Sequence, residues 1–527
     1  MPRRHDRSGR ANGLFVLSGG ALAALLVLGL LLYGMGRPSG SWSTTRGSGS
    51  GGEGGGGLVV YCAAGIRLPV EQIAAEYERE YGVPVHLQYG GSQTLLSQLE
   101  VARTGDLYLP GDDEYMELGR EKGLVRETIP LAMMRPVIIV RRGNPKEIRG
   151  IADLWREEVR TALGNPEQAA IGKLARKLLQ ATGQWERLEQ HVTRTGVFQP
   201  TVPEVANNVA IGSSDAGIVW DTTVALYPDL EAIDAPELAP GEAGISVGVL
   251  ESAKDPTAAL RLARYFGARD KGLARFRENG FRTVEGDKWS EHPEITFFCG
   301  SVNRRAVEPA IQAFERREGV RVNTVYNGCG ILTGQMRTIA GGRQGLGFPD
   351  TYMACDVYYL DAVKELFQDG VDISDTEVVI AVPKGNPKGI RTLRDLARPG
   401  VRVSVGQPDQ CTIGVLTRTL LQAEGVHEEV MANVATQTAT SALLVPTVTT
   451  GSVDATLAYA TDTLAEAERL EVIRIESPAA LAIQPFAIAR SSEQKQLARR
   501  LYETIAASRQ TFETAGFHWR LDARGAE

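Results

Sequence analysis

The sequence predicts an α/β protein in which one module occurs twice in tandem, behind a single N-terminal transmembrane helix. One strand–loop–helix pattern occurs twice at a constant spacing of 237 residues, so that Cys62 matches Cys299 and Gly82 matches Gly319. A constant spacing over more than thirty residues without a gap indicates an internal duplication. Within each copy, short apolar runs alternate with amphipathic helical patterns, which is typical of a parallel α/β sheet.

The N-terminal segment carries an apolar run between polar flanks. Residues 14–35 hold no charged side chain and are long enough to cross a hydrocarbon core of about 30 Å. The preceding residues 1–13 are rich in arginine, which predicts a cytoplasmic tail, and residues 36–57 form a Gly/Ser-rich linker. A cleaved signal peptide is the alternative, although its apolar region is usually shorter. We expect an uncleaved anchor in the inner membrane, with the modules on the periplasmic side.

Composition and motifs argue against several classes of protein. The net charge is −7, from 57 basic and 64 acidic residues, and gives no indication of a nucleic-acid partner. The six histidines are scattered, and no HExxH, CxxC, P-loop or GxSxG motif occurs. We therefore expect neither an enzyme nor a bound cofactor.

The repeated pattern ends its strands in small residues. In module 1, a helical spacing of apolar residues follows the first strand, and the second strand ends in Gly90-Gly91-Ser92. Ligands of parallel sheets bind at the carboxyl ends of strands, and the N–H groups at the next helix start attract anions. The alternative is that these glycines only form tight turns. Because both copies carry matched loops, we favour a binding site.

The later elements repeat in the same order. Module 1, residues 58–290, shows strand patterns at 105–116, 136–140, 161–172, 212–220 and 244–250. Module 2, residues 291–527, shows the equivalent patterns at 349–356, 378–387, 403–414 and 451–459. The spacing drifts between 237 and 244 residues, which indicates insertions in loops.

Both modules resemble the periplasmic molybdate-binding proteins of ABC transporters, a family of type II periplasmic solute-binding proteins. The motifs that carry the resemblance are Gly90-Gly-Ser92, Gly143-Asn-Pro145, Asn165-Pro-Glu167 with Gly172, and Gly217-Ile-Val-Trp220. The family implies two lobes per module joined by a hinge, with lobe A of module 1 at about 58–134 plus 245–290 and lobe B at 135–244. It implies a molybdate- or tungstate-like oxyanion in the cleft, and an ABC permease or a membrane sensor as partner.

The resemblance also implies which residues hold the ligand. In module 1 the family's ligand positions fall on Gly65, Ser92, Ile171, Val202 and Trp220, of which only Ser92 keeps its hydroxyl. In module 2 they fall on Ser301, Val302, Cys329, Ile413, Ser441 and Tyr459. Tyr459 matches the family's residue type, whereas Cys329 departs from it. Neither module has the complete pattern.

Module 2 holds four of the five cysteines: Cys299, Cys329, Cys355 and Cys411. If the strand order is 2-1-3, the first three lie at one sheet edge, where thiolates bind soft metals or metalloids. The alternatives are a disulfide between Cys299 and Cys329 or inert buried thiols. Soft-metal binding or sensing is therefore a second hypothesis. A cleft-cysteine enzyme is a third and weaker one, since no general base pairs with any cysteine.

Overall fold

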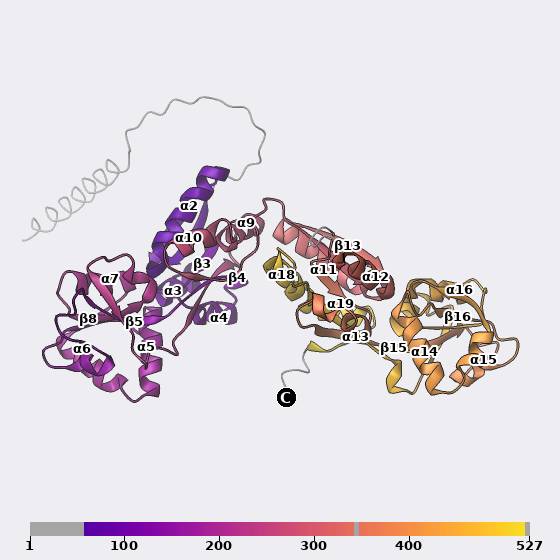
Figure 1. Ribbon diagram of the computed structural model, residues 1–527. Coiled ribbons are helices and arrows are strands. Elements are labelled where there is room, and N and C mark those ends of the chain that lie inside the picture. The colour runs from indigo at the N-terminus through magenta and orange to yellow at the C-terminus, as the bar shows by residue number, and fades with distance from the viewer. Residues whose placement is uncertain (1–56, 342–346, 522–527) are drawn as a thin grey trace, which may run out of the picture. The chain divides into compact units, whose positions relative to one another are not determined.

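The computed structural model describes residues 57–341 and 347–521 (Figure 1). The predicted cytoplasmic tail (1–13), the predicted membrane anchor (14–35) and nearly all of the predicted linker (36–57) lie outside these residues. Within the described part of the chain, no helix is both long and apolar enough to cross a membrane.

Lobe A of module 1 is built on a six-stranded sheet of order β11-β4-β10-β3-β1-β2. Its strands are β1 (Leu58–Ala63), β2 (Val85–Gly90), β3 (Leu107–Leu109), β4 (Val125–Met134), β10 (Ala243–Leu250) and β11 (Arg282–Thr283). Its helices are η1 (Ala64–Ile66), α2 (Arg67–Tyr81), α3 (Ser92–Ala102), α4 (Glu114–Glu121), α9 (Pro256–Gly267) and α10 (Gly272–Glu278). Strand β1 pairs in parallel with β2 and β3, which confirms the predicted 2-1-3 order.

Lobe B of module 1 has its own five-stranded sheet of order β7-β6-β8-β5-β9. Its strands are β5 (Pro136–Arg141), β6 (Thr161–Gly164), β7 (Val197–Gln199), β8 (Ala216–Trp220) and β9 (Leu230–Ile233). Its helices are α5 (Ala170–Ala181), α6 (Trp185–Thr195), α7 (Val202–Ala210) and α8 (Asp221–Val224). Only Arg135 separates β4 from β5, so the chain enters lobe B where the hinge was predicted.

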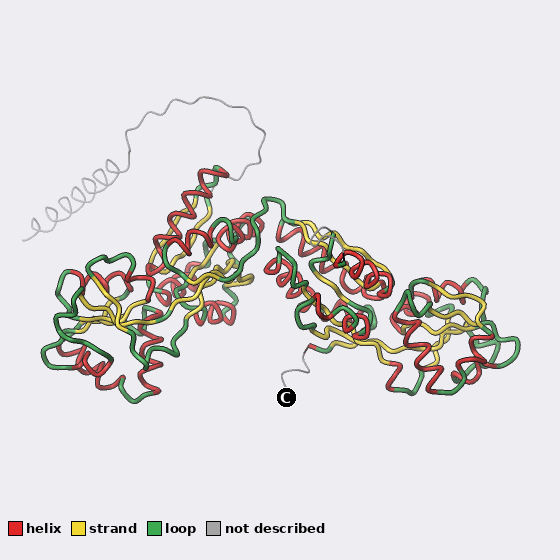
Figure 2. The backbone as a smooth tube through the Cα atoms, in the orientation of Figure 1, coloured by secondary structure: helices red, strands yellow, loops and turns green. Residues whose placement is uncertain are grey.

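Module 2 repeats this arrangement with one long strand in place of two. Its strands are β12 (Glu294–Gly300), β13 (Arg321–Asn327), β14 (Thr351–Met353), β15 (Val371–Pro383), β16 (Val403–Gly406), β17 (Val434–Thr438), β18 (Ala455–Tyr459), β19 (Leu470–Arg474), β20 (Leu481–Ile488) and β21 (His518–Trp519). The first part of β15 pairs with β20 of lobe A, and its last residues pair with β18 and β19 of lobe B. This strand therefore runs unbroken between the two lobes (Figure 2).

The helices of module 2 follow the order of module 1. They are η3 (Ser301–Asn303), α11 (Arg304–Glu318), α12 (Cys329–Ala340), α13 (Val357–Asp361), η4 (Lys364–Leu366), η5 (Leu393–Ala397), α14 (Thr412–Ala423), α15 (His427–Ala432), η6 (Ser441–Leu443), α16 (Leu444–Thr449), α17 (Ala460–Thr463), η7 (Leu464–Glu466), η8 (Pro478–Ala480), α18 (Lys495–Ala506) and α19 (Arg509–Thr514). The prediction of a duplicated α/β module is confirmed.

Helix α2 shows why the repeated sequence forms the repeated structure. Its buried side chains include Val70, Ile73 and Tyr77, which have the helical spacing that the sequence predicts. The helix ends at Gly82, whose φ of 68° is the left-handed conformation that glycine adopts without a steric cost. Its counterpart α11 ends in the same way at Gly319, with a φ of 65°. The matched glycines are therefore helix stops.

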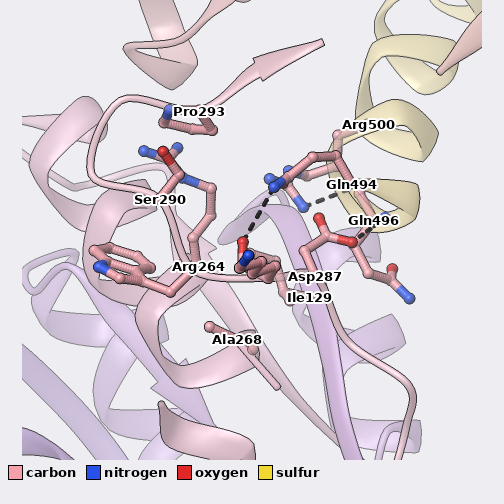
Figure 3. A pocket seen from close by; sticks show the side chains of 12 residues that line it. Ile129, Arg264, Ala268, Asp287, Ser290, Pro293, Gln494, Gln496 and Arg500 are labelled. Carbon is pink, nitrogen blue, oxygen red and sulfur yellow. Dashed lines mark hydrogen bonds between the residues drawn. The ribbon is translucent and has the colours of Figure 1, made fainter. Parts of the chain in front are cut away.

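Each module has its own hydrophobic core. Buried side chains from Leu58 to Phe281 form one cluster, and those from Ile295 to Phe517 form another. Polar groups connect the modules: Glu318 accepts hydrogen bonds from Arg264 of α9 at 2.8 Å and from Arg500 of α18 at 2.6 Å. The Asp287 carboxylate accepts a hydrogen bond from the backbone amide of Gln496 at 2.8 Å. Both residues line a pocket between the modules, together with Arg264 and Arg500 (Figure 3).

Candidate functional site

Module 1 contains a small cavity between its lobes. Its volume is about 20 Å³, close to the space that one water molecule requires. The lining residues are all uncharged: Ala63, Ala64, Gly65, Ile66, Gly90, Gly91, Ser92, Gly111, Ala169, Ala170, Thr201, Val202 and Trp220. Four of the five predicted ligand residues, all except Ile171, are therefore brought together.

Helix N-termini surround this cavity. The lining includes η1, which leads into α2, and the first residues of α3, α5 and α7: Ser92, Ala170 and Val202. The first N–H groups of a helix have no partner within the helix, and the helix dipole adds a partial positive charge there. The cavity is thus neutral in formal charge but rich in N–H groups that can face an anion.

Ser92 is the first residue of α3 and is 2% exposed. Its hydroxyl oxygen accepts a hydrogen bond from the Gly111 amide at 3.0 Å, and its carbonyl accepts one from the Tyr108 hydroxyl at 2.8 Å. Because the Gly111 amide occupies a lone pair of the hydroxyl oxygen, the hydroxyl proton is left to donate. The hydroxyl is therefore held in place as a donor.

The other predicted residues differ in what they contribute. A Cβ atom added at Gly65 would lie 3.4 Å from the Trp220 ring and 3.6 Å from the Val202 side chain, so these three residues meet across the lobes. Ile171 is fully buried behind the cavity, and its place in the lining is taken by Ala169 and Ala170. The lining residues at this helix start lie one and two positions before the predicted Ile171.

Several lining residues were missed by the sequence analysis. Gly111, Ala169 and Thr201 contribute backbone groups or short side chains to the lining of the cavity. No residue type in a sequence is typical of such a contribution. The signal that could have found Gly111 is its place in a small-residue loop directly after the third strand.

In each module a direct hydrogen bond joins lobe A to lobe B across the cleft, at an equivalent position. In module 1 the Gln93 amide of lobe A donates to the Gln168 carbonyl of lobe B at 3.2 Å. In module 2 the equivalent Gly330 amide donates to the Gln410 carbonyl at 3.0 Å. Each bond joins the start of a lobe A helix to the loop before a lobe B helix.

The predicted ligand residues of module 2 do not all line the same cavity. Ser301 and Val302 line a cavity of about 210 Å³ with Arg304, Arg305 and Asp462. Ser441 begins η6 and is 5% exposed, next to the lining residue Ala442. Cys329, Ile413 and Tyr459 are fully buried and do not line this cavity. The cavities that the predicted ligand residues line therefore differ in volume and in lining residues between the two modules.

Two buried polar groups of module 2 have raised pKa values. The Tyr459 hydroxyl has no hydrogen-bond partner among the described residues, and its pKa lies well above the usual range because of burial and the nearby Cys355. Burial also raises the pKa of Asp462 to about 6, although a hydrogen bond from Ser441 and the charge of Arg305 lower it.

The cysteines of module 2 do not form the predicted metal site. All five cysteines are free, and the described residues contain no group of three or more His, Cys, Asp or Glu placed to hold a metal ion. The alternative of a disulfide between Cys299 and Cys329 does not hold either, because both thiols are free. The Cβ direction of Gly300 points at the Cys329 and Cys355 sulfurs, so the adjacent Cys299 points to the opposite side of the strand. Cys411 donates to carbonyls of its own lobe.

Comparison with known families settles the class of protein. The sequence profile of the bacterial extracellular solute-binding proteins matches residues 58–282 and matches again at residues 295–518. The chain belongs to this family. It is a solute-binding protein rather than an enzyme, and it carries the family's unit twice.

Curated relatives of this solute-binding protein match about one module. The molybdate-binding protein ModA of Mycobacterium bovis is 29% identical over 256 residues, which is 48% of this chain and 91% of the relative. A binding protein of Haemophilus influenzae is 28% identical over 225 residues, 42% of this chain and 90% of the relative. The ModA of Escherichia coli is 24% identical over 186 residues, 33% of this chain and 72% of the relative.

Solved structures also resemble the solute-binding protein over less than half of its length. The periplasmic molybdate-binding protein of Azotobacter vinelandii is 16% identical with a TM-score of 0.38, covering 43% of this chain and all of its own. The sulfate-binding protein SubI of Mycobacterium tuberculosis is 20% identical with a TM-score of 0.37, covering 45% of this chain and 90% of its own.

Proposed function

We propose that this solute-binding protein captures a small tetrahedral oxyanion of the molybdate, tungstate or sulfate kind in the cleft of module 1. The observation that carries the proposal is the cavity of module 1, whose lining is uncharged and whose walls are helix N-termini. Two of the curated relatives, those of Mycobacterium bovis and Escherichia coli, are named molybdate-binding proteins, which supports the same ligand class.

The physical argument rests on how a dianion can be held without a counter-charge. Several N–H groups, each at the positive end of a helix, share the charge, and the Ser92 hydroxyl adds one donor. Closing the lobes removes water, which strengthens every one of these interactions. The Gln93–Gln168 hydrogen bond is the contact that would accompany closure.

The proposed setting is extracytoplasmic. Residues 14–35 would anchor the chain in the inner membrane, and an ABC permease or a membrane sensor would receive the ligand-bound form. The charge-free run behind an arginine-rich start motivates the anchor. Mass spectrometry of the mature protein tests it, since a chain that begins after residue 36 would exclude an anchor.

Calorimetric titration with molybdate, tungstate and sulfate tests the ligand. We expect at least one of the three to bind at micromolar concentration. The Ser92→Ala variant loses one donor to a charged ligand, which costs about 1.5–3 kcal/mol, or roughly 10–150-fold in affinity.

The matched control is Ser97→Ala, the same substitution on the exposed face of the same helix. We expect this variant to bind as the wild type does. Failure of all three anions to bind the wild type would contradict the proposed ligand class. An equal loss of affinity in both variants would instead remove the role assigned to the Ser92 hydroxyl.

A further inference from the structure

Two thiols of module 2 lie against each other at the edge of the cleft. The sulfur atoms of Cys329 and Cys355 are 2.8 Å apart, and the Cys355 amide donates to the Cys329 sulfur at 3.1 Å. Cys329 is the first residue of α12, and Cys355 lies in the loop after β14. Both belong to lobe A, and their exposed fractions are 0% and 4%. We call these two residues the thiol pair.

The surrounding residues make room for this pair. A Cβ atom added at Gly300 would lie 2.2 Å from the Cys355 sulfur and 2.8 Å from the Cys329 sulfur, so no larger residue fits there. Module 1 has Ala63 at the position of Gly300 and Gly111 at the position of Cys355. The strand residue thus lacks a Cβ atom in the module whose loop carries a thiol. The residue types at these two positions, Ala63 or Gly300 and Gly111 or Cys355, therefore change together between the modules.

The two thiols differ in acidity. Burial alone would raise the pKa of Cys329, but the adjacent Cys355 thiol, the nearby Tyr352 hydroxyl and the hydrogen bond from the Cys355 amide lower it. The start of helix α12 favours a thiolate as well. The pKa of Cys355 is raised, first by its hydrogen bond to Cys329 and then by burial. One thiol is therefore the better nucleophile, and the other keeps its proton beside it.

Contacts between the lobes cover the thiol pair. Next to Cys329, the Gly330 amide donates to the Gln410 carbonyl at 3.0 Å, and the Tyr359 hydroxyl donates to the Pro408 carbonyl at 2.8 Å. Because both thiols lie in lobe A, opening the lobes breaks these contacts and leaves the pair intact. The open form therefore gives reagents access to two thiols that the closed form buries.

We infer that Cys329 and Cys355 are a reversible redox site, which forms an intramolecular disulfide by exchange with a low-molecular-weight disulfide or a thiol–disulfide oxidoreductase. The Cys329 thiolate attacks the donor disulfide, forms a mixed disulfide and releases the first donor thiolate. The Cys355 thiol then loses its proton and attacks the Cys329 sulfur, and the second donor thiolate leaves. Two cysteine thiols are oxidised, one donor disulfide is reduced, and the two protons end on the two donor thiols.

The other cysteines do not share this arrangement. The Cys299 thiol contacts the Gly300 carbonyl at 3.7 Å, as the equivalent Cys62 thiol contacts the Ala63 carbonyl at 3.4 Å in module 1. Cys411 contacts carbonyls of lobe B. The structure therefore assigns the disulfide to one pair of the ten that five cysteines allow.

Peptide mapping of the full chain tests the inference without any ligand. The protein is equilibrated with mixtures of oxidised and reduced glutathione, its free thiols are blocked with iodoacetamide, and its peptides are identified by mass. In the oxidising mixtures we expect two of the five thiols to be lost and one crosslinked peptide to join Cys329 to Cys355. Dithiothreitol should restore all five thiols.

Variants identify the roles of the two residues. We expect Cys299→Ser and Cys411→Ser to form the crosslink as the wild type does. In Cys355→Ser we expect no crosslink, and the mixed disulfide with glutathione should accumulate on Cys329. Persistence of five free thiols in every oxidising mixture would overturn the inference, as would a crosslink through Cys299 or Cys411. The wild-type map decides the matter even if a variant fails to fold.

Discussion

Ser92 and Cys329 occupy equivalent positions, and each accepts a hydrogen bond from a backbone amide of the loop after the third strand. This backbone contact is therefore shared by the two modules, whereas the accepting atom is an oxygen in one and a sulfur in the other. A hydroxyl donates well to an oxyanion, whereas a thiol is a weak donor. Three differences between the modules, Ser92/Cys329, Gly111/Cys355 and Ala63/Gly300, thus separate the proposed oxyanion site from the thiol pair.

Asp112, next to Gly111, gives a residue-scale prediction about pH. Burial is the main cause that raises its pKa to about 6, and the neighbouring Glu114 and Asp113 add to it. The folded state therefore binds this proton more tightly than the unfolded state does. The associated stability is present at low pH and is lost as the pH rises through 6.

We expect Asp112→Asn to be more stable than the wild type at pH 7.5, by up to about 3 kcal/mol, because the charge is removed. The asparagine oxygen can still accept the hydrogen bond that Asp112 accepts from the Glu114 amide. Near pH 3.5 the advantage should vanish. Thermal unfolding between pH 3.5 and 8 measures this, and a stability difference that is independent of pH would contradict it.

At the scale of elements, the sequence predicted the strands and helices because these follow from the period of apolar residues. The 2-1-3 order of the first strands was assumed from the fold class and does not follow from that period. Helix α2 was predicted from such a signal, whereas its end at Gly82 is a finding of the structure. The sequence could not predict which of Cys299 and Gly300 faces the cleft, since that depends on the register of the last strand residues. It also missed Gly111, because an N–H group is common to nearly all residue types.

Cleft closure gives an element-scale prediction at Gly91, the residue that precedes α3. A Cβ atom added there would lie 2.3 Å from the Gln168 carbonyl oxygen of the opposite lobe. Its φ of −71° suits any residue, so lobe A should fold normally. We expect Gly91→Ala to hinder closure and to weaken oxyanion binding roughly 5–150-fold, which corresponds to an overpacking cost of about 1–3 kcal/mol.

Gly150→Ala is the control for this variant. Gly150 has an extended backbone and open space around its Cβ direction, so the same substitution should leave affinity unchanged. Calorimetric titration compares the two variants, and near-ultraviolet circular dichroism checks that both fold. Wild-type affinity in Gly91→Ala would show that the observed contact is not needed for binding.

At the scale of the whole molecule, the described modules share ion pairs rather than a core. Burial would raise the pKa of Glu318, but the charges of Arg500 and Arg264 outweigh burial and lower it. Arg264 comes from module 1, whereas Glu318 and Arg500 come from module 2. The single carboxylate therefore pairs with two buried guanidinium groups from different modules.

Glu318→Gln would leave both arginines without this charge. Breaking a buried pair costs about 3–5 kcal/mol, so we expect a large loss of stability at the junction of the modules. The control is Glu493→Gln, which breaks the more exposed pair with Arg269 and should cost less than about 1 kcal/mol. Scanning calorimetry of both variants tests this, and equal melting curves would contradict it.

The hydrophobic cluster of module 1 shares no side chain with the two clusters of module 2, as far as the described residues go. A substitution that rebuilds the packing of one cleft is therefore not transmitted to the other through a shared core. Because the cores are separate, the two copies can differ: module 1 has the uncharged cavity lined by N–H groups, and module 2 has four of the five cysteines. Duplication with separate cores thus lets a receptor acquire a second chemistry without giving up the first.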